Sequence, residues 1–217
     1  MALYHTGLFT TYLRPTALLN LRADEVIPRD STDPASQVVL VVAPFERGVA
    51  TKSGYYDETV LMDGSVCPVL GDLYIERAAT RRRASLDSRC DRATADSVCL
   101  WDFTAKALNN AWQEAVASMQ LESMDTVYQA RHGGASRDLM AKARSAEEVI
   151  LRGFWANLNA MRTYHKPGRI QQLVAKAHPD VLSYALDIKE NFAKYVRAGD
   201  FPRAPLVAPK RRRRAVD

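Results

Sequence analysis

The chain has 217 residues, of which 47% are hydrophobic and 25% are charged, a composition typical of soluble globular proteins and too apolar for a wholly disordered chain. Its longest apolar run, residues 38–43, is far shorter than the roughly 20 residues that cross a bilayer, so we expect no transmembrane helix and no membrane partner. The first residues lack the basic start and apolar core of a signal peptide, which predicts a non-secreted, intracellular protein.

Positive charge is concentrated at the C-terminus. The 30 basic and 25 acidic residues give a formal net charge of +5. Residues 201–217 hold six of the basic residues and one of the acidic ones, which leaves 24 of each in residues 1–200. The sequence therefore predicts an electrically neutral body that carries a cationic arm, and not a uniformly basic fold with a groove for polyanions.

Residues 1–78 are expected to be rich in β-structure. Residues 37–45, QVVLVVAPF, are apolar on both faces, which is typical of a central strand. Asp63 and Gly64 lie between two apolar runs and predict a two-residue hairpin turn, because both residue types tolerate a positive φ. An antiparallel or mixed sheet is expected. Two further candidate strands are residues 72–78 and, with a weaker pattern, residues 8–13.

Residues 79–95 interrupt the apolar pattern and are expected to form an exposed, arginine-rich connector. Three consecutive arginines, Arg81, Arg82 and Arg83, are candidates for a second phosphate-binding loop. The string RRAS that ends at Ser85 also resembles the substrate pattern of basophilic kinases, and a phosphate there would weaken the hold of these arginines on a polyanion. A solvated, salt-bridged loop is the alternative interpretation.

Residues 96–199 are expected to form a helical region, because apolar residues recur there at three- and four-residue intervals. The first helix is expected over residues 96–121. Pro179 suits the first position of the last helix, and Gly199 suits its C-terminal end. Between the helix over 96–121 and the last helix, the pattern predicts three more: a short helix over 124–131, a long helix from Ser136 to the break at Pro167, and a short helix over 170–177.

The pair Gly133-Gly134 precedes a predicted helix start, where backbone N–H groups could hold an anion. The segment lacks the spacing of a phosphate-binding loop, so a corner between two helices is the expected role. The neighbouring His132 is the one candidate for an acid or base. The spacing of the residues around His132 identifies no nucleophile and no carboxylate partner for it, so we expect a protein that is not an enzyme.

Cysteines and histidines do not form a metal motif. Cys67, Cys90 and Cys99 lack the spacing of zinc ligands, and the four histidines are scattered. Reduced thiols are expected, with no metal and no cofactor. Tyr55 and Tyr56 lie in a polar stretch and are candidates either for stacking on bases or for packing beneath the sheet.

The C-terminal residues 200–217 are expected to be a flexible tail, because prolines and a cluster of cations leave too few apolar groups to fold. Arginine presents a planar fork of donors that matches phosphate. The string PKRRRR also resembles a short nuclear-localisation signal, and a merely solubilising tail is a further alternative. The main candidate nucleic-acid-binding residues are Lys210, Arg211, Arg212, Arg213 and Arg214.

Strands followed by helices predict an α+β fold, in which an N-terminal antiparallel or mixed β-sheet precedes a C-terminal helical bundle and a disordered basic tail. The favoured functional hypothesis is a non-enzymatic, nucleic-acid-associated structural or packaging protein, with the layout of a viral or mobile-element coat protein or nucleoprotein. Its neutral body would self-associate or join a larger assembly, in the nucleus or a virion, while the arm neutralises DNA or RNA. The alternative is an adaptor that acts through protein contacts and uses the tail as a targeting signal.

Overall fold

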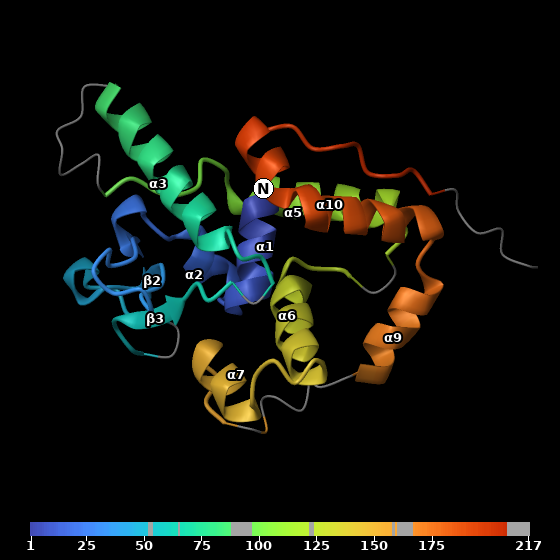
Figure 1. Cartoon of the computed structure of the whole chain (residues 1–217), viewed down its shortest axis with the longest axis horizontal. Helices are drawn as coiled ribbons and strands as arrows, with labels where there is room; N and C mark the ends of the chain where they lie inside the picture. Colours follow the sequence, from blue (N-terminus) through green and yellow to red (C-terminus); the bar gives the residue numbers. More distant parts are fainter. Residues whose placement is uncertain are drawn as a thin grey trace, which may run out of the picture.

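Helices form most of the secondary structure, with a small antiparallel sheet at one end of the molecule (Figure 1). This computed structural model describes residues 1–51, 54–64, 66–87, 97–121, 124–157, 159 and 167–207. The fold is mixed helix and strand, as expected. The helices are α1 (Ala2–Thr11), α2 (Pro15–Leu19), α3 (Leu70–Asp87), α5 (Ala105–Ser118), α6 (Tyr128–Met140), α7 (Ala146–Arg152), α9 (Pro167–Lys176) and α10 (Pro179–Ala198), with short 3₁₀ turns η1 (Ala23–Glu25) and η2 (Phe45–Arg47).

The sheet has three antiparallel strands in the order β1 (Val26–Ile27), β2 (Val39–Val42) and β3 (Glu58–Leu61). The prediction of a central strand within residues 37–45 is confirmed, because β2 pairs with both neighbours. Leu40 lies opposite Val26 on one side and Val60 on the other, and all three are at most 2% exposed. This row therefore forms the inner face of the sheet, against the core.

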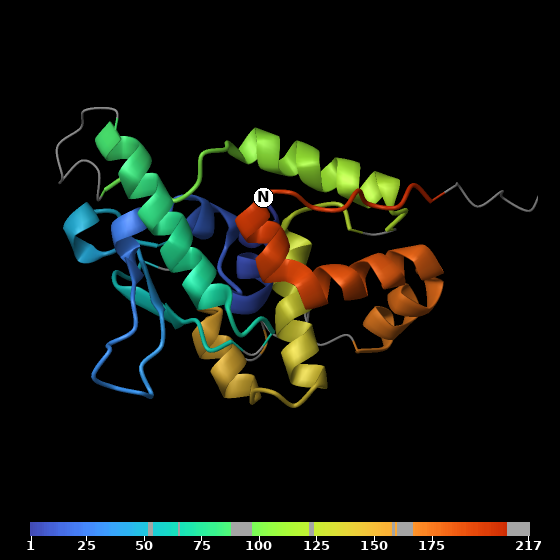
Figure 2. The ribbon, with the colours of Figure 1, turned by 45° about the horizontal axis from the view of Figure 1, so that its top comes forward.

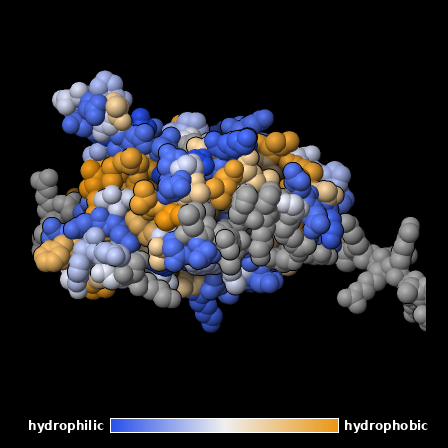
Figure 3. Space-filling model, turned by 90° about the horizontal axis from the view of Figure 1, so that it is seen from below, coloured by the Kyte–Doolittle hydropathy of each residue, from blue (hydrophilic) through white to orange (hydrophobic). Residues whose placement is uncertain are grey.

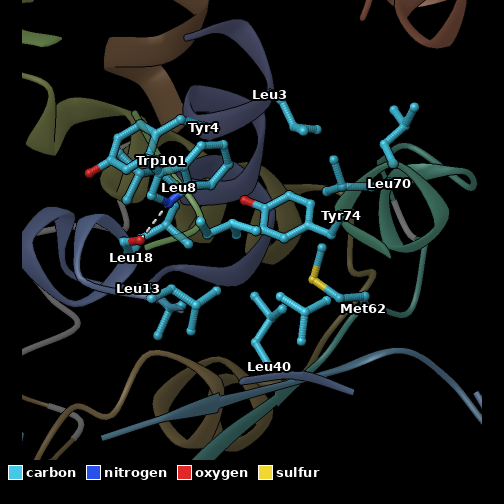
Figure 4. Packing of buried hydrophobic residues seen from close by; sticks show 14 of the residues in the cluster. Leu3, Tyr4, Leu8, Leu13, Leu18, Leu40, Met62, Leu70, Tyr74 and Trp101 are labelled. Atoms are coloured by element: carbon cyan, nitrogen blue, oxygen red, sulfur yellow. Dashed lines mark hydrogen bonds between the residues drawn. The ribbon is translucent and has the colours of Figure 1, made fainter. Parts of the chain in front are cut away.

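Helix α1 runs through the middle of that core. Its Tyr4 and Leu8 are fully buried, and the Trp101 ring lies edge-on to Tyr4 at 5.3 Å between centroids. The indole N–H of Trp101 donates to the Leu18 carbonyl at 2.7 Å, as Figure 4 shows. The predicted strand over residues 8–13 is wrong, because a helix that is buried on several sides has no clean 3.6-residue pattern to distinguish it from a strand.

Helix α3 replaces two predicted features. Residues 72–78 are not a strand, and residues 79–87 are not a loop, because α3 continues from Leu70 to Asp87. Its buried residues lie at helical spacing, and they are followed by alanine and arginine, which are strong helix formers. The arginine-rich polar stretch is thus the continuation of a core helix. The buried side chains that start it are Leu70, Leu73, Tyr74 and Ala78.

No hairpin forms at Asp63-Gly64 within the described residues. Strand β3 ends at Leu61, and the chain leads from there into α3. Gly64 does adopt the expected positive φ of 69°. The Asp63 carboxylate accepts a hydrogen bond from Arg144, so a distant partner, and not a local turn, determines its position.

The first helix of the helical region starts later in the chain than the sequence predicts. The predicted helix over residues 96–121 is shorter, since α5 starts at Ala105 after its N-cap Thr104. The residues before it pair with an N-terminal segment: the Leu100 N–H donates to the Leu21 carbonyl at 2.9 Å, and the Ala23 N–H donates to the Val98 carbonyl at 2.9 Å. These long-range hydrogen bonds hold that stretch extended.

Helix α6 runs straight through His132, Gly133 and Gly134, so the prediction of a helix–helix corner there is wrong. The predicted long helix after Ser136 is wrong as well. Residues 136–152 form the end of α6 and the short α7, which begins with a capping box between Ser145 and Glu148, and residues 158 and 160–166 of the prediction lie outside the described residues. A capping box starts a new helix because the two side chains satisfy the first unpaired N–H groups.

The predictions for the last two helices are confirmed. Helix α9 covers the predicted 170–177 segment apart from its final residue. Helix α10 has Pro179 in its first turn and ends at Gly199, whose φ of 67° is the left-handed conformation that glycine adopts readily. In the part of the chain that the structure describes, no helix has the length and apolar content needed to cross a bilayer.

Candidate nucleic-acid interface

The α3 arginines predicted to contact phosphate are for the most part committed to the fold. Arg81 Nε donates to the Cys99 carbonyl at 3.0 Å, and Arg82 Nη2 donates to the Ala23 carbonyl at 2.6 Å. One turn earlier, Arg77 Nη2 binds Asp102 Oδ1 at 2.6 Å. These guanidinium groups hold other segments of the chain against α3.

Arg83 differs from its two neighbours. Its side chain is exposed, and among the described residues no hydrogen bond or ion pair is found for it. Arg83 therefore retains the capacity to meet an external anion, whereas Arg81 and Arg82 would first have to release a carbonyl oxygen. Ser85, at the end of the kinase-like string, lies in the last turn of α3 and not in a loop.

Residues 200–207, predicted as the start of the flexible tail, lie against the helices. The Phe201 ring contacts Phe192 and Tyr195 at centroid distances of 6.3 and 5.7 Å. Val207 donates its N–H to the Ser118 carbonyl at 3.1 Å, and its own carbonyl accepts from Gln120 Nε2 at 2.9 Å. The segment thus follows α5 to its C-terminal end (Figure 2).

The point where the cationic arm leaves the body is consequently defined. Val207 is the last described residue, and the red C-terminal segment runs towards the end of the long axis opposite to α3 (Figure 1). The predicted binding residues Lys210, Arg211, Arg212, Arg213 and Arg214 lie outside the described residues.

The tyrosine pair in the connection between β2 and β3 is exposed. Tyr55 is 67% exposed, Tyr56 is 39% exposed, and the neighbouring Phe45 is 67% exposed. The Phe45 and Tyr56 rings meet edge-on at 5.3 Å. Of the two interpretations of this pair, packing beneath the sheet is therefore wrong, and these aromatics are available to a partner.

His132, the candidate acid or base, lies inside α6, where its ring meets Tyr128 edge-on at 4.7 Å. The two cavities described for the body measure about 140 and 310 Å³, and neither is lined by a histidine or a cysteine. Among the described residues no three histidine, cysteine, aspartate or glutamate side chains converge as metal ligands. Cys67 and Cys99 are free thiols, and Cys90 lies outside the described residues.

A buried ionic network that the sequence pattern does not reveal joins α1, α6 and α7. Asp138 is 1% exposed. Its carboxylate accepts hydrogen bonds from Tyr12 Oη, from Arg137 Nη1 at 2.6 Å and from Arg144 Nε at 3.1 Å. Arg144 also binds Asp63, which Arg152 Nη1 approaches at 3.4 Å. No local signal could have located this network, because Tyr12 and Asp138 are 126 residues apart.

Burial and charge shift the pKa values of this network. Burial raises the pKa of Tyr12, and the hydrogen bond to Asp138 raises it further, so the phenol stays protonated and donates. Burial lowers the pKa of Arg152 despite the nearby Asp63. Burial also acts to lower the pKa of Arg144. The hydrogen bond to Asp63 and the charge of that carboxylate outweigh burial, so the pKa of Arg144 is raised. The ion pairs and hydrogen bonds of this network hold α7 against the core.

Comparisons with known proteins identify no family for this chain. No protein-family model matches the chain, and no curated protein matches it in sequence. The functional argument therefore depends on the distribution of charge, the exposed side chains and the geometry described above.

Proposed function

We propose that this protein is a non-enzymatic, nucleic-acid-associated structural or packaging protein of the coat or nucleoprotein type, whose neutral body assembles while its C-terminal arm neutralises phosphates. The observation that carries the proposal is the segregation of charge. The arm provides five consecutive cations, Lys210 to Arg214, on a body with equal numbers of basic and acidic residues. Such a layout concentrates polyanion binding in the arm.

The arrangement of the described residues supports this division of roles. Arg77, Arg81 and Arg82 are engaged with carbonyl oxygens or a carboxylate within the fold. The segment before the arm is tethered by Val207 to the end of α5, so the arm starts from a set position on the surface. Nucleic acid in the nucleus or in a virion is the polyanion that this arm would meet.

Counterion release provides the test. Five cations engaged on duplex DNA predict a slope of about −4.5 for log K against log salt, and about −3.5 on single strands. Replacing Lys210 and Arg211–Arg214 by glutamine should abolish most of this slope in a fluorescence-anisotropy titration at several salt concentrations. A body variant with the same loss of charge is the control, with Lys106, Lys142, Lys176, Lys189 and Lys194 replaced by glutamine; all five side chains are exposed.

The two variants have the same net charge, so they separate the position of the charge from its amount. The proposal requires that the arm variant loses binding and that the body variant keeps a slope close to that of the wild type. Equal binding by the wild type and the arm variant would contradict it.

A further inference from the structure

The cavity of about 140 Å³ beside the sheet contains polar groups that the fold itself does not use. Glu58 of β3 lies directly opposite Val42 of β2, so both project from the inner face of the sheet, and both line this cavity. Among the described residues the Glu58 carboxylate has no hydrogen bond and no ion pair. Thr51 also lines the cavity, and its buried Oγ1 has no hydrogen-bond partner in the same part of the chain. Buried polar groups normally have partners, so these two call for a ligand.

Arg47 supplies hydrogen-bond donors to the same cavity. Its Nη1 donates to Glu25 Oε1 at 2.7 Å and to the Asn20 carbonyl at 3.2 Å. Within the described ranges no other nitrogen of this guanidinium group is hydrogen-bonded, and the side chain is 23% exposed. Arg47 and Glu58 line one cavity without pairing with each other. A ligand that both donates and accepts hydrogen bonds therefore suits the space they share.

The chain around the cavity is shaped before any ligand binds. Ala43 and Phe154 line the cavity with φ angles of 52° and 51°, in the left-handed region that is costly for residues with a β-carbon. Strain of this kind clusters at ligand sites. Asp57 closes the base of the connection between β2 and β3, because its N–H donates to the Ala43 carbonyl at 3.0 Å and its Oδ1 accepts from the Phe45 N–H at 2.9 Å. A site that is formed in advance loses less entropy on binding.

Exposed aromatic rings belong to the same connection. Phe45 shares the η2 turn with Arg47, and the Tyr55 carbonyl accepts from the Thr51 N–H at 2.9 Å. Both rings are 67% exposed. On the left of Figure 3, at the end where Figure 1 places the sheet, hydrophobic side chains lie on the surface among hydrophilic ones. Exposed aromatic rings beside cationic and hydrogen-bonding groups are typical of surfaces that stack bases of single-stranded nucleic acid.

The size and lining of the cavity fit one pyrimidine base. A cavity of roughly 150 Å³ holds a benzene ring, so the cavity here matches a single six-membered ring and not the fused rings of a purine. The Glu58 carboxylate can accept a hydrogen bond from a ring N–H or an amino group of the base, and Arg47 can donate to a ring carbonyl oxygen. Apolar walls from Leu13, Val42 and Phe154 suit the faces of the ring.

From these contacts we infer that the body binds single-stranded nucleic acid at the connection between β2 and β3. Bases stack on Phe45 and Tyr55, and one pyrimidine enters the cavity between Arg47 and Glu58. The inference rests on the proposed function, and it adds base contacts on the body to the phosphate contacts of the arm. A duplex cannot use this site, because its bases are already paired and stacked.

The test is a pair of fluorescence-anisotropy titrations of the full-length protein, purified free of nucleic acid, at low salt. One probe is a labelled oligothymidine, and the other is an abasic oligonucleotide of the same length. Both probes carry the same phosphates, so the ratio of their dissociation constants reports the base contacts alone. Two stacked bases at about fivefold each predict that the wild type prefers oligothymidine by at least about thirtyfold.

Phe45→Ala and Tyr55→Ala should each lower this ratio by about fivefold or more. Tyr55→Leu keeps an apolar side chain without a ring and should lower the ratio as well, whereas Tyr55→Phe keeps the ring and should preserve it. Circular dichroism establishes that each variant is folded before it is compared. A wild-type ratio close to one, or a ratio that Phe45→Ala and Tyr55→Ala leave unchanged, would overturn the inference.

Glu58→Gln and Glu46→Gln form a matched pair that tests the cavity. Each removes one negative charge, but Glu46 is exposed in η2 and does not line the cavity. Only Glu58→Gln should lower the ratio, by about threefold or more, because the base loses a charged acceptor. The gain in affinity from a lost negative charge applies to both probes and cancels. Equal ratios for the two variants, or tighter binding of an oligoadenylate than of oligothymidine, would overturn the placement of a pyrimidine in the cavity.

The arm variant described above separates this inference from the proposed function. It should lose the salt slope and keep the ratio, whereas Phe45→Ala and Tyr55→Ala should lose the ratio and keep the slope. A high ratio in a protein whose salt slope does not depend on the arm would refute the proposed role of the arm alone. The expected slope together with a ratio of one would refute the base-binding site alone.

Discussion

Gly134 of α6 lies against the Phe9 carbonyl of α1, so closely that a β-carbon on Gly134 would stand 1.7 Å from the Phe9 oxygen. The two helices can cross at this distance because the glycine has no side chain. Gly134 therefore permits the close packing of two helices that are far apart in the sequence.

Gly134→Ala should destabilise the protein by about 3 kcal/mol, at the upper end of the cost of overpacking, because the neighbour is backbone and cannot rotate away. Urea unfolding followed by circular dichroism measures the change. Gly168→Ala in α9 is the control, since nothing lies within 4 Å of its β-carbon position. Its stability should be unchanged or higher by up to about 1 kcal/mol. Equal effects of the two substitutions would contradict the close crossing.

Asp138→Asn should cost about 2–3 kcal/mol of stability, because it weakens buried hydrogen bonds to a charged carboxylate while Arg144 keeps its pair with Asp63. Glu76→Gln makes the same chemical change in the exposed pair with Arg197 and should cost less than about 1 kcal/mol. The free energy of unfolding of both variants, measured at one pH, gives the comparison. A loss at Asp138 as small as the loss at Glu76 would show that the network contributes little.

His5 should make the protein less stable in mild acid. Burial, with the nearby Met1 amino group, lowers its pKa to about 4, whereas an unfolded histidine titrates near 6.5. Between these values the unfolded chain binds more protons than the folded one. Stability is therefore fully present above pH 6.5 and falls by about 3 kcal/mol as the pH drops towards 4.

His5→Gln should remove this component of the pH dependence, measured as the difference in unfolding free energy from the wild type at pH 7, 5.5 and 4. His178→Asn is the control, because His178 is exposed at the start of α10 and asparagine can still cap the helix. A wild type and a His5→Gln variant with parallel pH profiles would show that His5 is not buried as described.

Arg82 and Arg83 are adjacent in sequence and should behave differently. Arg82→Gln should lower stability by about 1 kcal/mol, because the Ala23 carbonyl loses its donor. Arg83→Gln should leave stability within about 0.5 kcal/mol of the wild type, as for other exposed sites. Thermal unfolding distinguishes the two variants. If Arg83→Gln were the more damaging substitution, the placement of these side chains on α3 would be wrong.

Local sequence features were sufficient for some elements. The continuous apolar run of β2 is typical of a strand with neighbours on both sides, and its central position is observed. Pro179 and Gly199 bound α10 because each acts on the backbone conformation of its own position. The segregation of cations onto the arm is likewise a property of the sequence alone.

Only the tertiary structure decided the features that depend on distant partners. The burial of α1 on several sides hides its helical period, and Gly134 acquires its role only where Phe9 approaches it. Asp63 meets Arg144 across 81 residues, and Arg82 meets a carbonyl 59 residues away. The free energy that positions these groups comes from contacts between separate segments, and a pattern read along one segment contains no record of them.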